Sequence, residues 1–218
     1  NETRSQPSSG EFVTTVTAAA KSEDDGVPEM SFYSSVGPVS DKRWSRARWR
    51  RPYGLTALGG DVTTPPGVLD VYQHGIESVK SKDMPAGPSD APDGKHTRMS
   101  GTSMSNPMVA AIALLVKQAA MKVLTEGSPA HRFFTENLPQ AVTLILMRSS
   151  KDMGVPVFMQ EGGFVDAEAA VLQAASSFGG SLTSWPRKAA SAVLSAARAA
   201  WRRAAAPAAE GAQPWDWM

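Results

Sequence analysis

The sequence predicts an α/β fold with a doubly wound parallel sheet at its centre. Short β-branched runs in the first third of the chain are followed by longer apolar segments with helical spacing, and strands that alternate with helices favour parallel sheets. The 218 residues are enough to bury one sizeable core. Their composition, 42% hydrophobic and 20% charged, is that of an ordinary globular protein.

Three short apolar segments are the candidate strands. Residues 12–19 are β-branched and typical of a buried strand, and residues 53–62 are short, apolar and interrupted by Gly59-Gly60. Residues 30–38 end in Gly-Pro, which stops any strand there. Residues 42–51 are rich in Lys and Arg and include two tryptophans, a pattern that can bind phosphates or an anionic membrane. We favour the interpretation that residues 42–51 form a solvated peripheral insert whose two tryptophans pack against the domain.

The candidate helices lie in the second half of the chain. Residues 104–124 are so apolar that we expect this helix to be largely buried. A second helix is expected at residues 134–149, a short extended piece at 155–158 and a third helix at 166–175. Residues 65–95 are rich in Pro, Gly, Asp, Lys and Ser, and we interpret them as a long surface loop with little regular structure.

A change in composition after Phe178 divides the chain into two parts. Residues 1–178 form the main domain portion, and residues 179–218 form an Ala/Arg/Trp-rich tail with one extra helix from about residue 187 to 205. The tail has a weak amphipathic stripe that favours docking on the domain, or on a partner subunit, over insertion into a membrane.

Composition also excludes several classes of protein. The net charge of +1 argues against a general nucleic-acid binder. The absence of cysteine excludes disulfides, thiolate catalysis and zinc–thiolate sites. No run of 18 apolar residues is present, so no transmembrane segment is expected. Since the chain opens with Asn1 and not Met, we expect a processed product or a fragment.

Residues 99–111 (MSGTSMSNPMVAA) form the pattern that carries chemistry. Gly101 supplies a backbone that can turn tightly without crowding a substrate. Ser103 then opens a helix, whose free N–H groups and positive dipole end favour the anion that forms when a carbonyl is attacked. Pro107 falls in the first turns of that helix, where its missing N–H costs least. The pattern predicts that Ser103 is a nucleophile.

This stretch resembles the serine motif of the subtilisin-like serine peptidases, G-T-S-M-[AS]-x-P followed by V-A. Three more segments resemble motifs of that family in the same order. Residues 34–38 (SSVGP) are similar to its F-S-S-x-G-P turn, and residues 55–62 to its D-[VIL]-x-A-P-G segment, with Leu58 where proline is usual. Residues 160–167 (QEGGFVDA) are similar to the G-x-G-x-[IV]-[DN] close of the catalytic domain. The other departures are Met108, where histidine is frequent, and Ala111, where glycine is usual.

The resemblance implies that this chain is the C-terminal half of a subtilisin-like catalytic domain. In the family the order is Asp, His, an oxyanion-hole Asn and then Ser, and the D-[ST]-G and H-G-T motifs do not occur here. The resemblance therefore implies Ser103 as the nucleophile, Asn1 as a candidate oxyanion donor, and an upstream half that supplies Asp and His as a partner. It also implies a polypeptide substrate, no cofactor beyond an optional structural calcium ion, and a secreted or lumenal location.

None of the three histidines has the sequence context of a catalytic base. His74 lies in the long unpatterned loop, and His131 follows a Gly-Ser-Pro turn and is typical of a surface position. His96 is seven residues before Ser103 and is the better candidate for a base, although we favour a solvent-exposed loop position for it too. Asp83, Asp90 and Asp93 lack the spacing of an EF-hand calcium loop.

Two functions from different classes remain open at this stage. The first is a subtilisin-like serine endopeptidase fragment or subunit, inactive without its upstream half. The second is an inactive subtilisin-like module that serves as a structural or interaction subunit. The presence of Ser103 favours the endopeptidase, because a serine that no longer acts as a nucleophile is free to be replaced.

Overall fold

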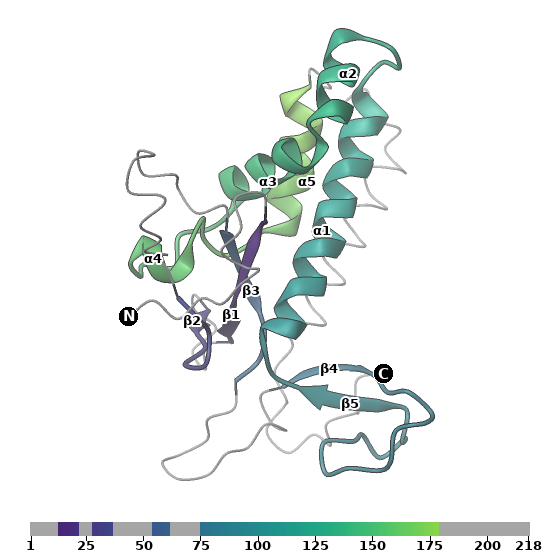
Figure 1. Cartoon of the computed structure of the whole chain (residues 1–218), viewed down its shortest axis with the longest axis vertical. Coiled ribbons are helices and arrows are strands. Elements are labelled where there is room, and N and C mark those ends of the chain that lie inside the picture. The colour runs from purple at the N-terminus through teal and green to yellow at the C-terminus, as the bar shows by residue number, and fades with distance from the viewer. Residues whose placement is uncertain (1–12, 22–27, 37–53, 62–74, 179–218) are drawn as a thin grey trace.

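A three-stranded sheet lies at the centre of the computed structural model, which describes residues 13–21, 28–36, 54–61 and 75–178 (Figure 1). Strand β1 (Thr15–Ala20) pairs in parallel with β3 (Gly54–Leu58) over five residue pairs. The two-residue β2 (Glu29–Met30) pairs antiparallel with the end of β1, so the order is β2-β1-β3. The parallel strands predicted at residues 12–19 and 53–62 are therefore confirmed.

A distant segment lines the other edge of β3. Thr56 forms an isolated parallel bridge with Phe164, and its hydroxyl donates to the Gln160 carbonyl at 2.9 Å, 104 residues along the chain. Thr56 N–H donates to Gly163 O, and Val165 N–H donates to Thr56 O, each at 2.9 Å. The last part of the described chain thus completes the sheet on this side.

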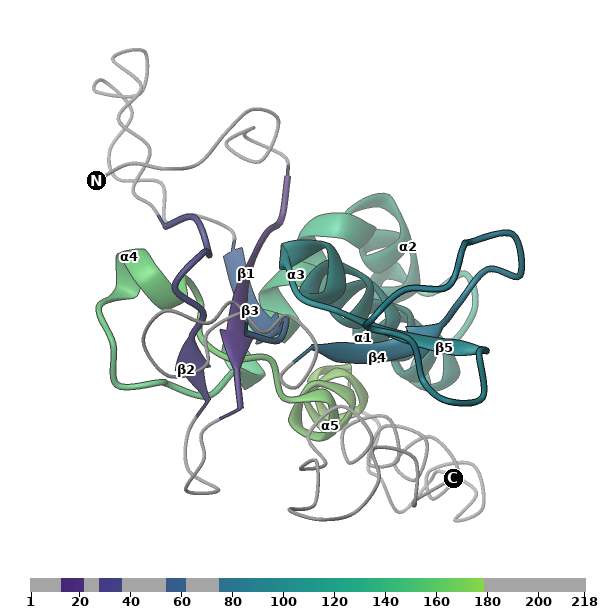
Figure 2. The ribbon, with the colours of Figure 1, turned by 90° about the horizontal axis from the view of Figure 1, so that it is seen from below.

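Three helices pack against the parallel strands and supply most of the core. They are α1 (Thr102–Val123), α3 (Leu138–Ser149) and α5 (Ala167–Ser177), which contact one another, and α1 contacts both β1 and β3. The one-turn helix α4 (Val157–Gln160) lies on the opposite side of the sheet (Figure 2). The largest fully buried side chains are those of Phe134, Phe164, Leu55, Leu146 and Val116. The described residues thus have the predicted α/β class, whereas the tail 179–218 and the basic segment 42–51 lie outside them.

Two local predictions in the second half were wrong. The helix expected at residues 134–149 is two helices, α2 (Pro129–Glu136) and α3, that meet at Asn137. Pro139 explains the break, because a proline ring collides with the carbonyl four residues earlier and cannot continue a helix. The piece expected to be extended at residues 155–158 is instead the start of α4, which Pro156 precedes with φ −53°.

The long loop predicted at residues 65–95 was also wrong in part. Strands β4 (Ile76–Val79) and β5 (His96–Met99) pair antiparallel into a hairpin. Arg98 Nε donates to Glu77 Oε2 at 3.1 Å, and Lys80 forms an ion pair with Asp90 across the hairpin. Paired backbone and opposite charges stabilise a segment that has no apolar periodicity. The hairpin nevertheless stays peripheral, at the end of the molecule where α1 begins (Figure 1).

Helix α1 is less buried than its composition indicates. Only 28% of its most apolar stretch is buried, through residues such as Val109, Val116 and Ala119, while Leu114 is 67% exposed. By length and composition alone α1 could cross a membrane, which the sequence expectation of no transmembrane segment did not anticipate. Such a helix is weak evidence for a membrane span, since core helices of soluble proteins pass the same test. One apolar face of α1 is therefore uncovered by the described residues.

Replacing Phe134 by Ala tests the helical core. The Phe134 ring is fully buried and meets Phe178 edge to face, with ring centroids 5.1 Å apart. We expect Phe134→Ala to lower the free energy of unfolding by about 3–5 kcal/mol because it leaves a cavity. The neighbouring Phe133 is 64% exposed, so Phe133→Ala should change it by less than about 0.5 kcal/mol. Urea titration followed by circular dichroism measures both, and equal losses would contradict this packing.

Candidate active site

Ser103 lies in the first turn of α1, as the sequence predicts, and is exposed to solvent. The residue before the helix, Gly101, has φ 155° and ψ 163°, a conformation essentially restricted to glycine. Because the first N–H groups of a helix have no partner within it, the Ser103 amide is available to a ligand, and the helix dipole favours negative charge there. This end of α1 therefore presents both a hydroxyl and an anion-binding amide.

Pro107 lies in the second turn of α1, within the first turns as the sequence predicts, but not where a missing N–H costs least. It is the sixth residue of the helix, past the positions whose N–H groups lack helical acceptors. Proline has no N–H, so Pro107 cannot donate to the Ser103 carbonyl four residues earlier. The missing bond costs more here than at the first position of a helix.

A short segment after β3, Gly59-Gly60-Asp61, holds the start of α1 in place, and we call it the carbonyl segment. Gly101 N–H donates to Gly59 O at 2.8 Å, and Ser100 Oγ donates to Asp61 O at 2.7 Å. Gly59 N–H in turn donates to Ala19 O at 2.9 Å. The carboxyl ends of β1 and β3 thus set the position of Ser103, at the edge of a parallel sheet where ligands usually bind.

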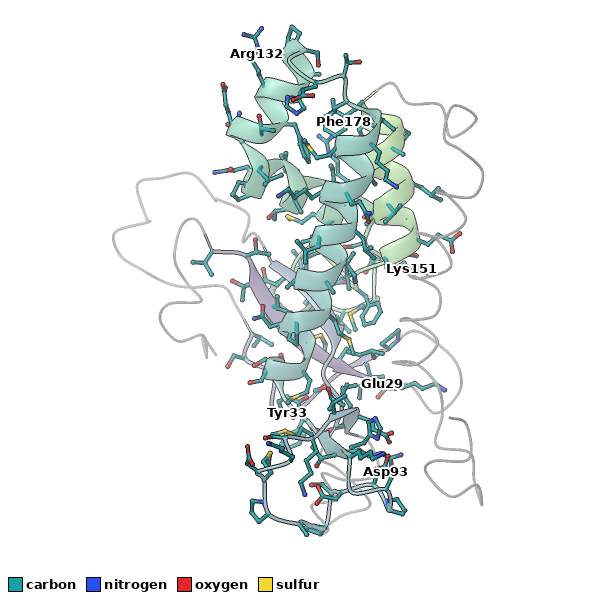
Figure 3. All side chains as sticks on the ribbon, turned by 90° about the vertical axis from the view of Figure 1, so that its right-hand side faces the viewer. Glu29, Tyr33, Asp93, Arg132, Lys151 and Phe178 are labelled. Atoms are coloured by element: carbon teal, nitrogen blue, oxygen red, sulfur yellow. The ribbon has the colours of Figure 1, made fainter. Side chains whose placement is uncertain are left out.

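Two hydroxyls from the turn after β2 bind the same carbonyl segment. Tyr33 Oη is 2.8 Å from Gly59 O and 2.7 Å from Gly60 O, and Ser31 Oγ donates to Gly60 O at 2.8 Å. Figure 3 shows Tyr33 at the end of α1 where the helix begins. Sequence reasoning missed these hydroxyls, although Tyr33 at the Phe position of the F-S-S-x-G-P turn is a visible departure.

The Tyr33 hydroxyl stays protonated at neutral pH. Burial raises the pKa of Tyr33 above its ordinary value, and the Asp61 carboxylate also raises it, whereas the Ser31 hydroxyl and the Gly101 N–H act in the opposite direction. A protonated phenol is a hydrogen-bond donor, which is the role that two carbonyl neighbours require.

The contact between β3 and α1 leaves no spare volume. A Cβ at Gly59 would lie 2.5 Å from Ser105 Oγ, 2.6 Å from Ala18 Cβ and 2.8 Å from Gly101 O. Ser105 is fully buried, and its hydroxyl has no hydrogen-bond partner among the described residues. A small residue is therefore required on both sides of this contact.

The described histidines do not form a base for Ser103 in this geometry. His96 Nδ1 lies 2.7 Å from Asp93 Oδ2 in the hairpin, and the length of β5, about 10 Å, carries His96 away from the start of α1. His131 lies in α2, beside Arg132 at the opposite end of the molecule from Tyr33 in Figure 3. His74 and Asn1 lie outside the described residues.

The described residues do not form a metal centre. Within residues 13–21, 28–36, 54–61 and 75–178, no group of three or more His, Cys, Asp or Glu side chains is placed to hold a metal ion. The optional calcium ion stays a prediction from the resemblance.

The model of the subtilase family (Peptidase S8) matches residues 1–163. The chain belongs to the subtilase family. The matched region includes Ser103 and the carbonyl segment. The matched region extends to Asn1 and ends before the tail.

Solved protease structures resemble the chain at low sequence identity. A protease from Pseudoalteromonas arctica PAMC 21717 shares 22% identity at TM-score 0.47, over 78% of this chain and 38% of that protein. The patellamide maturation protease PatA shares 20% identity at TM-score 0.44, over 80% and 46%, and the prenylagaramide maturation protease PagA shares 20% at 0.44, over 77% and 44%. The chain thus spans less than half the length of these proteases. No curated protein matches it.

Replacing Ser105 by Ala tests the unpaired hydroxyl. A buried hydroxyl without a partner is destabilising, so Ser105→Ala should raise the free energy of unfolding by about 1 kcal/mol. Ser103→Ala is the matched control, since Ser103 is exposed in the same turn and should change stability by less than about 0.5 kcal/mol. Thermal and urea unfolding measure the difference, and a loss of stability in Ser105→Ala would show that its hydroxyl has a partner.

Replacing Gly59 by Ala tests the close approach of β3 and α1. The added methyl must displace Ser105 or the Gly101 carbonyl, and we expect a loss of about 1–3 kcal/mol. Gly87→Ala is the control, because a Cβ at Gly87 meets nothing within 4 Å. Denaturant titration compares the two, and similar small effects would mean that the contact is looser than described.

Proposed function

We propose that this subtilase chain is the nucleophile-bearing part of a serine endopeptidase, and that it acts on polypeptides only when complemented by the upstream half of the same catalytic domain. The observation that carries the proposal is the exposed Ser103 hydroxyl in the first turn of α1, behind a glycine in a conformation reserved for glycine. That arrangement is what a nucleophile needs to approach a planar carbonyl from an uncrowded side.

In the proposed reaction Ser103 Oγ attacks the carbonyl carbon of a peptide bond while a base takes its proton. The carbonyl oxygen becomes an oxyanion, which the free Ser103 N–H and the dipole of α1 stabilise. An Asn side chain supplies the second donor, and we assign this role to Asn1 by resemblance. The proton then passes to the leaving amine, and water releases the acyl group from Ser103 by the reverse steps.

The base and its orienting carboxylate come, in this proposal, from the upstream half. The uncovered face of α1 supports such a partner: Pro107, Ala110, Ala111 and Leu114 are all exposed on it. A helix of this composition that packs on a sheet is usually covered on more than one side.

An open edge of the sheet supports the same partner. Ala18 accepts from Ser31 N–H at 3.0 Å and donates to Ser34 Oγ at 2.9 Å, both on the side of β1 away from β3. The alternation of a strand places the backbone groups of Val16 on that same side, where no described strand pairs with them. A further parallel strand beside β1 would satisfy them.

Labelling with a fluorophosphonate probe tests the proposal. We expect the purified 218-residue chain to remain unlabelled alone, because no described histidine serves Ser103, and to label after addition of the segment encoded directly before it. Ser103→Ala should abolish that labelling, and gel fluorescence measures it.

The remaining outcomes discriminate between functions. Labelling of the chain alone that is lost in His96→Ala would place the base in the hairpin and contradict the requirement for a partner. A stable complex that does not label would contradict the peptidase and favour an inactive module that assembles with its partner.

A further inference from the structure

The turn after β2 contains a hydroxyl with no counterpart in the motif that it resembles. In the F-S-S-x-G-P pattern the position of Tyr33 is Phe, so the phenolic oxygen is a feature of this chain. The ring packs edge to face on Phe32, with ring centroids 5.8 Å apart. The oxygen meets two consecutive carbonyls, Gly59 O and Gly60 O.

One of these carbonyls is hydrogen-bonded to the residue that precedes the helix carrying Ser103. Gly59 O also accepts from Gly101 N–H at 2.8 Å, so Tyr33 and Gly101 share one acceptor. Gly101 is the last residue before α1, and its dihedral angles set the direction of the Thr102 and Ser103 amides. The Ser31 hydroxyl donates to the next carbonyl, Gly60 O, and also interacts with the Tyr33 hydroxyl.

We propose that Tyr33 is a positioning residue for Ser103: its hydroxyl fixes the Gly59 and Gly60 carbonyls and, through the Gly59–Gly101 hydrogen bond, the orientation of the amide end of α1. Tyr33 acts through Gly101 and does not contact the substrate. The part of this inference that concerns catalysis rests on the proposed function, whereas the part that concerns Gly101 does not.

Hydrogen exchange of individual amides tests the positioning. In the ¹⁵N-labelled full chain, Tyr33→Phe removes the hydroxyl and keeps the ring, and we expect the Gly101 amide to exchange about five- to tenfold faster, the effect of one hydrogen bond. Ser31→Ala should change that rate less, because the Ser31 hydroxyl donates to Gly60 O and not to the Gly59 carbonyl that Gly101 N–H binds.

A stability control separates positioning from general loosening. Thr17 and Thr56 share a buried hydroxyl pair at 2.7 Å within the body of β1 and β3, away from the carbonyl segment. Thr17→Val removes a buried hydroxyl there and should lower stability without singling out Gly101. Equal exchange of Gly101 in Thr17→Val and Tyr33→Phe would overturn the inference.

Kinetics of the complemented protein extend the test to function. We expect Tyr33→Phe to lower the rate of Ser103 labelling, and kcat on a peptide substrate, several-fold at unchanged KM, and Thr17→Val to leave both near wild type. If the wild-type complex does not label, the proposed function fails while the exchange of Gly101 still decides the role of Tyr33. If the Gly101 amide exchanges faster in Tyr33→Phe but Ser103 is labelled at an unchanged rate, Tyr33 has a structural role only, and its role in catalysis is overturned.

Discussion

The close approach of Gly59 to the start of α1 is the constraint on which the rest of the site depends. One contact joins the end of a parallel strand to the beginning of a helix, with Ser105 and Ala18 close enough that not even a methyl group fits. The same glycine carries the carbonyl that Gly101 N–H binds. Steric fit and a backbone hydrogen bond therefore fix the same two elements, so the direction of α1, and with it the position of Ser103, follows from the path of β3.

Side-chain hydroxyls bind the backbone carbonyls that follow the end of β3. The last register pair of β3 is at Leu58, and the carbonyls of the next three residues are bound by the hydroxyls of Ser31, Tyr33 and Ser100 as well as by Gly101 N–H. Hydroxyl groups suit this task because they are short and rotate to meet an acceptor. The site thus combines a rigid helix start with a segment whose order depends on a few polar side chains.

Much of this could be predicted from the sequence, for physical reasons that differ between elements. The sequence predicts β1 from its β-branched residues and β3 from a short apolar run, and it predicts α1 from a long apolar segment behind a Gly-Thr-Ser start. The break at Asn137 was missed because apolar periodicity continues across it, while Pro139 acts through a backbone clash that periodicity does not register.

The hairpin and the polar contacts of the site were missed for a different reason. Strands β4 and β5 are held by backbone pairing and by charge pairs such as Glu77–Arg98, which have no apolar signature. Tyr33 and Gly59 lie far apart in sequence, and nothing local indicates that they meet. The partial exposure of α1 was missed because composition reports what a helix could bury and not what surrounds it.

The edge of β3 that Phe164 covers has a consequence for the order of folding. The hydroxyl of Thr56 can form its hydrogen bond only after Gln160, 104 residues further along the chain, has been synthesised. At roughly 5–20 residues per second, a ribosome exposes β3 for about 5–20 s before that segment emerges. The hairpin and α1 are complete within this interval, but the sheet is not, so a nascent chain spends seconds with an unsatisfied strand edge that other chains can pair with. Completion of the sheet therefore depends on a contact between segments 104 residues apart, and a chaperone that shields strand edges during synthesis would raise the yield.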